Sequence, residues 1–368
     1  MGELNSKQFC ICKSASSLKR KNCSKGSLSP PSSLTFRDKA FIHSKTQKKN
    51  QKKLKYSFEK DFHLIKEIGR GSYGNIYLVT LNQTKQNYAV KQINKKINFI
   101  QENEKEKNIY NEKKILKYLS HPFIIKLHFS FQDEDNLYLV MDYISGGDLS
   151  SYIHNSKNFN EEIAKFFLSE VYLAIRYLHS KNIIHRDIKS ENILLDSNGH
   201  IKLIDFGSSK KGVDNTNLTS SFIGTPECLP PEVLQHKPYG FSYDWWCFGI
   251  LMYEMIYGFP PFRDFYQGGI FHLILNSEPL YYKFHPSYLP RKVKISNNAI
   301  DLMQKLLCKS PEKRIKPEEI PKHPFFKGID FDRIKKQEIE VPHLKNLREY
   351  FTSIKDMAKE VTNDNLIL

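Results

Sequence analysis

Two oxygen-bearing side chains in the middle of the chain are predicted to face each other across a β-hairpin. Asn192 directly precedes the apolar run 193–195, and Asp205 directly follows the returning run 200–204. The Asp-Ser-Asn-Gly segment between the runs is typical of a tight turn in which Asn-Gly favours positive φ. Residues at the open end of a hairpin lie opposite each other, and an amide oxygen with a carboxylate suits Mg²⁺. The spacing therefore predicts a magnesium site formed by Asn192 and Asp205.

A second acidic residue, Asp187, lies close enough to Asn192 to act on a hydroxyl group beside such a metal ion. The sequence from 185 to 192, His-Arg-Asp-Ile-Lys-Ser-Glu-Asn, followed by Asp-Phe-Gly from 205, resembles the catalytic and metal-binding loops of eukaryotic protein kinases. Asp187 or Asn192 alone would fit an ordinary solvated turn, but both motifs in this order are specific. The resemblance implies that Asp187 accepts the substrate's hydroxyl proton and that Lys189 neutralises charge on the transferred phosphoryl group.

A glycine-rich segment, Gly69 to Gly74, lies between two predicted strands, 62–68 and 75–80. The GxGxxG pattern also occurs in Rossmann folds, but there the glycines open a helix, whereas here a β-branched and aromatic run follows. The glycines are therefore predicted at a hairpin tip, as in the kinase glycine-rich loop. The resemblance implies that ATP and Mg²⁺ are the cofactors and that the following residues bind them: Ile68, Gly69, Arg70, Gly71, Ser72, Tyr73, Gly74, Asn75, Ile76, Ala89, Lys91, Asp142, Ile144, Asp148, Glu191, Asn192, Leu194 and Asp205.

Lys91 and Glu112 are predicted to pair inside the small domain. Lys91 shares one face of the predicted strand 87–93 with apolar residues, so it needs an anionic partner to offset its desolvation. In the predicted helix 103–119, Glu112 falls on the apolar face. The alternative is that the two charges are unrelated and exposed, because Lys and Glu side chains usually lie on the protein surface. The resemblance instead implies the kinase ion pair that steadies Lys91 against the phosphates of ATP.

The C-terminal part is predicted to be mainly helical. Asn-Glu-Glu at 160–162 would cap a helix that leads to the catalytic loop, and the run 243–255 is apolar nearly all round, as in a core helix. The resemblance implies that Asp244 accepts hydrogen bonds from the catalytic-loop backbone and that Glu232 pairs with Arg314.

The fold class predicted is α+β: a bilobal protein-kinase fold with a small β-rich N-lobe, one main N-lobe helix and a larger helical C-lobe. The predicted divisions are a disordered basic tail over 1–57, a kinase domain over 58–326 (N-lobe 58–141, hinge 142–144, C-lobe 145–326) and a C-terminal tail over 327–368.

The finer match is to AGC-group kinases of the cyclic-nucleotide-dependent and phosphoinositide-dependent types, carried by the runs 137–149, 221–227 and 244–246. In this group the residue at Ser221 carries the activation-loop phosphate, so an upstream kinase or autophosphorylation is implied. The phosphate would bind Arg186 and Lys210 and order a loop predicted to be mobile. Unlike many AGC kinases, the chain has no Phe-x-x-Phe motif near its C-terminus.

The resemblance also implies protein substrates with Ser or Thr near basic residues. Lys189, in the run Asp-Ile-Lys-Ser, favours Ser/Thr over Tyr substrates. Asp148, Glu191 and Glu254 match acidic positions that read basic residues upstream of the phosphorylated one. One departure lies inside the catalytic loop, where Ser190 replaces the commoner proline.

The positive charge is concentrated at the N-terminus. The formal net charge is +16, yet residues 1–55 alone hold 14 Lys and Arg against two acidic residues. This segment could attract an anionic membrane or nucleic acid, or act only as a solubilising extension. The six cysteines lack zinc or disulfide spacing, and no signal peptide or membrane-spanning run is present. We therefore expect a cytoplasmic protein.

The first residues also fit an N-myristoylation pattern, with Gly2 after Met and Ser6 four positions on, although Glu3 does not favour it. One acyl chain anchors only weakly, so more than weak membrane contact would require either palmitoyl groups on Cys10 or Cys12 or the cluster of basic residues in this segment.

Two other functions remain open from sequence. A pseudokinase scaffold would normally have lost Lys91, Asp187 or Asp205, and all three are present. A nucleic-acid-binding protein is suggested only by the basic N-terminal segment, and we expect no specific nucleic acid. This function would be tested by deleting residues 1–55 and measuring how the affinity for nucleic acid depends on salt concentration.

Overall fold

The computed structural model describes residues 56–71, 74–95, 105–155, 160–214, 216–263, 269–281, 294–342 and 352, with side chains of the helix that starts at 105 described from residue 110. The chain separates into two units, residues 1–54 and 55–368, and all described residues belong to the second. The predictions for Gly2, Cys10, Cys12 and the rest of the basic N-terminal segment therefore lie outside the described residues, as do those for Ser72 and Tyr73.

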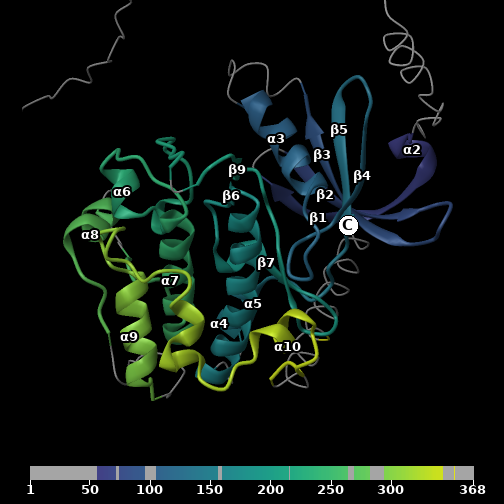
Figure 1. Cartoon of the computed structure of the whole chain (residues 1–368). Coiled ribbons are helices and arrows are strands. Elements are labelled where there is room, and N and C mark those ends of the chain that lie inside the picture. The colour runs from purple at the N-terminus through teal and green to yellow at the C-terminus, as the bar shows by residue number, and fades with distance from the viewer. Residues whose placement is uncertain are drawn as a thin grey trace, which may run out of the picture. The chain divides into compact units, whose positions relative to one another are not determined.

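The N-terminal part of the second unit contains a five-stranded antiparallel sheet (Figure 1). Its strand order is β1-β2-β3-β5-β4. Strands that are consecutive in the sequence are therefore neighbours in the sheet, except that β5 lies between β3 and β4. Leu, Val, Ile and aromatic residues alternate with polar residues in much of these strands, as expected for a half-buried pleated surface. The strands are β1 (Phe62–Gly71), β2 (Gly74–Leu81), β3 (Asn87–Asn94), β4 (Leu127–Gln132) and β5 (Asn136–Asp142).

Aromatic residues cover one face of this sheet. Tyr56 stacks on Phe129 with ring centroids 4.4 Å apart, and Phe58 stacks on Tyr138 at 5.0 Å. These contacts tie the short helix α2 (Phe58–Asp61) and the residues before it to the sheet. The aromatic layer leaves the opposite face, with Lys91, for the site described below.

The C-terminal part is mainly helical, and its apolar core is continuous with residues of α3 (Lys105–Lys117) from the N-terminal part. Every residue from Tyr243 to Tyr257 in α7 (Ser242–Tyr257) is buried, which agrees with the prediction of a core helix. The side chain of Asn160 caps α5 (Glu161–Ser180) by accepting the N–H of Ile163 at 3.0 Å. The other helices are α4 (Leu149–Asn155), α6 (Pro231–Leu234), α8 (Ile270–Asn276), α9 (Asn297–Leu306) and α10 (Phe331–Lys335).

Two short antiparallel pairs surround the catalytic loop. Strands β7 (Ile193–Leu195) and β8 (Ile201–Leu203) form the predicted hairpin, with Ile193 opposite Leu203. In its turn only Gly199 has a positive φ, at 87°, and Asn198 does not. The four-residue Asp196–Gly199 turn needs left-handed backbone at its last residue alone, so the expectation for Asn198 was wrong.

The segment after the Asp-Phe-Gly motif is held by backbone pairing at both ends. Strand β9 (Lys210–Lys211) pairs with β6 (Ile183–Ile184), and Thr219 forms an antiparallel bridge with Tyr239. Its polar, aperiodic sequence had suggested a mobile loop. The partners of these bonds lie far away in sequence, so local pattern could not reveal them.

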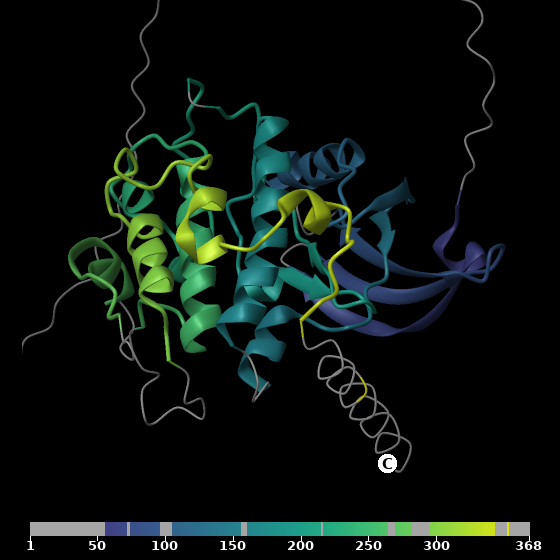
Figure 2. The same cartoon turned by 60° about the horizontal axis from the view of Figure 1, so that its bottom comes forward.

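The apolar core extends past residue 326. Figure 2 shows the yellow segment that carries α10 lying along α5. Phe331 packs edge-on against Tyr172 with centroids 5.2 Å apart, and Ile334 and Val341 are buried in the same core as α5 and α7. Residues 327–342 are therefore part of the packed domain.

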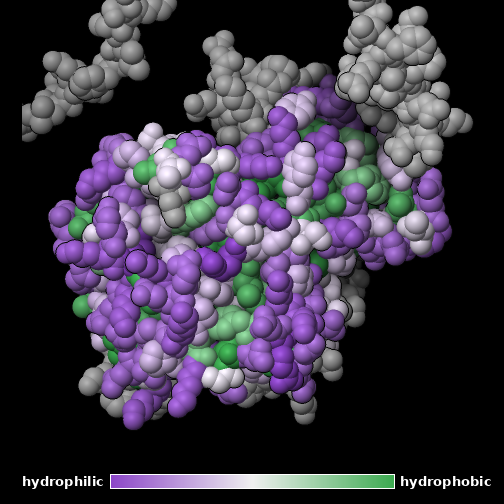
Figure 3. Space-filling view, in the orientation of Figure 1, coloured by the Kyte–Doolittle hydropathy of each residue, from purple (hydrophilic) through white to green (hydrophobic). Residues whose placement is uncertain are grey.

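The face of the molecule drawn in Figure 3 is largely hydrophilic, in keeping with the burial of most large apolar side chains. Within the described residues, no helix combines the length and apolarity needed to cross a membrane. The predicted α+β class, with a small β-rich part carrying one main helix and a larger helical part, is confirmed.

Candidate active site

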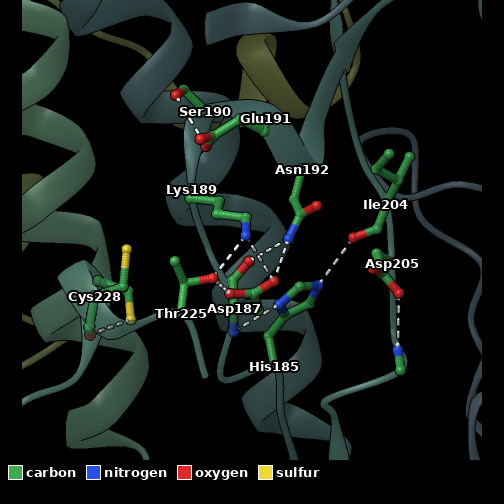
Figure 4. A network of polar contacts seen from close by, with 12 residues as sticks. His185, Asp187, Lys189, Ser190, Glu191, Asn192, Ile204, Asp205, Thr225 and Cys228 are labelled. Atoms are coloured by element: carbon green, nitrogen blue, oxygen red, sulfur yellow. Dashed lines mark hydrogen bonds and ion pairs between the residues drawn. The ribbon is translucent and has the colours of Figure 1, made fainter. Parts of the chain in front are cut away.

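Asp187 lies at the centre of a polar network formed by the catalytic loop and a residue far along the chain (Figure 4). Its Oδ2 accepts a hydrogen bond from Asn192 Nδ2 at 2.7 Å, and its Oδ1 accepts one from the Thr225 hydroxyl at 2.5 Å. Lys189 Nζ lies 3.3 Å from the same carboxylate and donates to Thr225 Oγ1 at 2.6 Å. The loop thus fixes the carboxylate and sets a cation beside it.

Asn192 and Asp205 lie next to each other at the open end of the β7–β8 hairpin, as predicted. The N–H of Ile204 donates to the carbonyl of Asn192 at 2.9 Å, which aligns the two chain segments. Both side-chain hydrogen bonds of Asn192 use its amide nitrogen, so the amide oxygen is left for a further ligand. Asp205 has a φ of 57°, which turns its side chain out of the strand direction.

Lys91 forms a buried ion pair with Glu112, with Nζ 2.9 Å and 3.0 Å from the two carboxylate oxygens. Lys91 is 3% exposed and Glu112 is 2% exposed, so the alternative of two surface charges is excluded. Lys91 Nζ also lies 3.5 Å from Asp205 Oδ1 and so links β3, α3 and the metal-binding loop.

These contacts set the charges of the site. Burial would lower the pKa of Lys91, but the charges of Glu112 and Asp205 outweigh it and raise that pKa. Burial would raise the pKa of Asp205, yet Lys91 and the N–H of Gly207 hold it below its usual value. Burial would lower the pKa of Lys189, but the negative charge of Asp187 outweighs burial and raises that pKa. The site therefore presents two ammonium groups and an ionised carboxylate at neutral pH.

The side chain of Asp244, at the start of α7, holds the backbone of the catalytic loop by hydrogen bonds. Its carboxylate accepts the backbone N–H groups of His185 and Arg186, each at 2.9 Å, and the Nε2–H of His179 at 2.8 Å. Arg186 has a φ of 68°, a conformation that this anchoring stabilises. The role implied for Asp244 thus has its structural counterpart, as does the pairing of Glu232 with Arg314 at 2.9 Å.

The residues expected to bind the nucleotide lie on β1, β2 and β3, at the end of β5 and in the segment after it, in the turn before β7, on β7, and just after β8. The segment after β5 reaches β7 directly, since Asp148 bridges Leu194. Several of the expected side chains have other described partners. Asp142 accepts from His128 at 2.6 Å, Arg70 pairs with Glu67 on the surface, and Asn75 donates to the Tyr77 hydroxyl at 3.1 Å. The described members of the set are Ile68, Gly69, Arg70, Gly71, Gly74, Asn75, Ile76, Ala89, Lys91, Asp142, Ile144, Asp148, Glu191, Asn192, Leu194 and Asp205.

The three acidic residues expected to read basic substrate residues have different surroundings. Asp148 accepts from the backbone N–H and the hydroxyl of Ser151 at 2.7 and 2.9 Å, and thereby caps α4. Glu191 is exposed, whereas Glu254 is 9% exposed and accepts a hydrogen bond from Ser190. Burial raises the pKa of Glu254 to about 7, and the bond from Ser190 acts in the opposite direction.

Arg186 connects the catalytic loop with the segment that contains Ser221. Its Nε donates to the carbonyl of Ser208 at 2.6 Å and its Nη1 donates to the Tyr239 hydroxyl at 3.2 Å. That hydroxyl in turn donates to the carbonyl of Ser221 at 2.6 Å. The guanidinium is 3% exposed, and its side-chain partners in the described structure are neutral.

The hydroxyl of Ser221 also lies close to a second cation. Lys210 Nζ donates to Thr219 Oγ1 at 2.9 Å, and Thr219 Oγ1 lies 3.2 Å from Ser221 Oγ. The structure thus brings Arg186 and Lys210 to the same stretch as Ser221, as predicted.

Sequence reasoning missed two contributors to this site. Thr225 has no spacing relation to Asp187, which lies 38 positions earlier. Asn111 of α3 donates to the carbonyl of Ser209 at 2.7 Å and so ties the helix that carries Glu112 to the segment after the metal-binding loop. The signal for Thr225 was its place in the Gly-Thr-Pro-Glu run, whereas no local signal marked Asn111.

Comparisons with known proteins agree with this geometry. Residues 62–326 match the protein kinase domain. The chain is 42% identical over 292 residues to serine/threonine-protein kinase Sgk1 of both Gallus gallus and Homo sapiens, covering 78% of this chain and 65% of each relative. It is also 39% identical over 342 residues to protein kinase 3 of Dictyostelium discoideum, covering 87% of this chain and 36% of the relative.

The matched region thus spans 65% of the length of the Sgk1 proteins. The similarity to Sgk1 agrees with the AGC-group resemblance of the runs at 221–227 and 244–246. Because the family match covers most of the domain in which Asp187, Asn192 and Asp205 come together, we conclude that this chain belongs to the protein kinase family.

Proposed function

We propose that the protein transfers the γ-phosphoryl group of ATP to Ser or Thr hydroxyls of proteins. The observation that carries this proposal is the network around Asp187, where a carboxylate is fixed by Asn192 and Thr225 next to the Lys189 ammonium. Such a carboxylate can orient a hydroxyl and accept its proton, while Lys189 balances charge on the phosphoryl group in transfer.

The side chains present fit Mg²⁺ and ATP. Mg²⁺ prefers a few oxygen ligands from the protein, completed by phosphate and water. The free amide oxygen of Asn192 and the ionised carboxylate of Asp205 supply such ligands. The ion would neutralise charge on the phosphates of ATP. Lys91, held by Glu112, supplies a fixed positive charge for the same phosphates.

The proposed substrates carry basic residues upstream of the phosphorylated hydroxyl. Support comes from Glu191 and Glu254, which lie on either side of the hydroxyl of Ser190. Purified protein incubated with MgATP and a peptide array tests the proposal directly. It predicts phosphorylation of Ser and Thr peptides with upstream Arg or Lys, and little transfer to Tyr. Preference for acidic or proline-directed peptides would contradict the substrate class.

The proposed switch is phosphorylation of Ser221, by an upstream kinase or by the protein itself. A phosphate adds nearly two negative charges and several acceptors beside Arg186 and Lys210, whose described side-chain partners are neutral. The resulting charge-assisted bonds would order the segment from 208 to 224 further, in addition to the backbone pairing of β9 and Thr219.

Phosphatase treatment of active protein, together with Ser221→Ala and the neighbouring Ser220→Ala as control, tests the switch. Activity should fall after phosphatase treatment and in Ser221→Ala, and persist in Ser220→Ala. Full activity of Ser221→Ala would rule the switch out.

A cytoplasmic location, with weak membrane contact through the basic N-terminal segment, stays a prediction. Its support is the charge of residues 1–55 and the pattern at Gly2. Binding of the full chain to anionic vesicles, compared with a chain lacking residues 1–55, would test it.

A further inference from the structure

Ser190 stands where kinase catalytic loops more commonly have proline. Its hydroxyl donates a hydrogen bond that a proline side chain could not make. Ser190 Oγ lies 2.9 Å and 2.8 Å from the two carboxylate oxygens of Glu254. It also lies 3.4 Å from Glu191 Oε2, a contact drawn in Figure 4. Two carboxylates from separate elements therefore converge on one fully buried hydroxyl.

We propose that Ser190 is a positioning residue that holds the Glu254 carboxylate ready to bind one basic side chain of the substrate. This inference rests on the proposed protein kinase function and adds to it the residue that prepares one specificity site. Ser190 has no part in the phosphoryl transfer itself.

The charge of Glu254 is poorly compensated within the protein. Among the residues that the structure describes, no Lys or Arg forms an ion pair with it, and His154 on α4 is the one cationic candidate that influences it. Glu254 also lies in the last turn of α7, where the helix dipole disfavours a negative charge. A nearby second carboxylate, Glu191, adds repulsion. An incoming guanidinium or ammonium group would remove all of these penalties.

The hydroxyl of Ser190 is the donor that keeps this carboxylate usable before substrate arrives. A buried carboxylate without a donor either takes up a proton or rotates toward water. A hydroxyl shared between both oxygens opposes protonation and fixes the plane of the group. Loss of the hydroxyl should therefore weaken recognition of the basic residue at this one site.

The experiment uses the full chain with MgATP and a set of peptides built on one Ser-containing sequence. Each peptide carries Arg at one upstream position and is paired with a peptide that has uncharged, equally shaped citrulline there. The position read by Glu254 is the one at which Glu254→Gln removes the preference for Arg. At that position, Ser190→Ala should lower the Arg-to-citrulline ratio of kcat/KM about tenfold, mainly through KM of the Arg peptide.

Three further variants sharpen the test. Ser190→Thr keeps a hydroxyl and should restore the ratio. Ser180→Ala removes a hydroxyl that donates to the Tyr177 carbonyl at the exposed end of α5, and should leave the ratio unchanged. Ser190→Ala in the Glu254→Gln background should cause no further change, because the two residues act through one contact.

Each outcome decides between the two proposals. No transfer to any peptide by the wild type would contradict the proposed function itself. Normal transfer with an unchanged or raised ratio in Ser190→Ala would overturn the role of Ser190 and leave the kinase function standing. An equal loss on Arg and citrulline peptides would show that Ser190 only supports the loop, which also overturns the inference. If Ser190→Thr does not fold, the double variant still decides.

Discussion

At the scale of single residues, Glu254 is a buried carboxyl group whose pKa is raised into the neutral range. Burial raises its pKa to about 7 from an ordinary 4.5. Because the pKa in the folded protein is higher than in the unfolded chain, ionisation of Glu254 disfavours folding. With respect to this group, the free energy of unfolding is highest below pH 4.5. It decreases as the pH rises from 4.5 to about 7 and stays at the lower value above that pH.

The Glu254→Gln variant, which cannot ionise, should therefore gain stability over the wild type as pH rises from 4.5 to 7. The expected gain at pH 8 is on the order of 3 kcal/mol. Denaturant unfolding of both proteins between pH 5 and pH 8 measures it. If the difference in free energy of unfolding between Glu254→Gln and the wild type did not vary with pH, Glu254 would not be a buried carboxylate with little charge compensation.

Residue types and spacing predicted those parts of the site whose partners lie in one loop or follow one period. Asp187, Asn192 and Asp205 were found through a loop and a hairpin, and Glu112 was placed opposite Lys91 by helical and strand periods. The contact of Ser190 with Glu254 spans 64 positions and that of Thr225 with Asp187 spans 38. No local period links such residues, so only the packed structure shows these contacts.

At the scale of elements, Gly74 is a glycine because two strands approach each other closely. A Cβ added at Gly74 would overlap the backbone carbonyl of Gln92 on β3 and lie 3.1 Å from Ile93 Cα. A Cβ added at Gly69 on β1 would meet nothing within 4 Å. Thus one glycine of the GxGxxG pattern is required by packing of the sheet, apart from any contact with phosphates.

Gly74→Ala should therefore destabilise the sheet by about 1–3 kcal/mol, because β2 and β3 must move apart. Gly69→Ala serves as the matched control and should change stability by less than about 1 kcal/mol. Thermal unfolding without nucleotide separates this effect from ATP binding. Equal melting temperatures for the two variants would show that the close approach of β2 to β3 does not constrain residue 74.

The strand and helix predictions were accurate where a period was clear and less so at element ends. Strand β4 begins only at Leu127, because Ile124 instead bridges to Leu203 of β8. The segment after the metal-binding loop looked aperiodic, yet β9 and the Thr219–Tyr239 bridge hold it. In each case a partner distant in sequence decided the local structure.

At the scale of the whole molecule, the packed domain continues beyond the last family motif. Ile334 and Val341 are buried against the core that contains α5 and α7. A chain that ends at Phe326 should therefore be less stable than one that ends at Pro342, by about 3–6 kcal/mol for two buried aliphatic side chains. Denaturant unfolding of the two chains measures this difference. Equal stability would mean that residues 327–342 only lie on the surface.

The two halves of the site come from the sheet and from the helical part, and the buried contacts of Lys91 join them. Lys91 on β3 pairs with Glu112 on α3 and reaches Asp205 after β8. This arrangement places an ammonium group that we propose binds phosphate, and a proposed metal ligand, next to the Asp187 network. The central claim is that this assembled site transfers a phosphoryl group with Asp187 acting on the substrate hydroxyl.

The most direct test compares the wild type with Asp187→Asn for phosphoryl transfer to a Ser peptide and for MgATP binding by calorimetry. Asp187 contributes no predicted metal ligand, so MgATP affinity and melting temperature should be unchanged in the variant. Transfer should fall at least about a hundredfold, the usual contribution of a positioned base. Wild-type transfer by Asp187→Asn would contradict the account, as would a wild type that binds MgATP but phosphorylates no peptide.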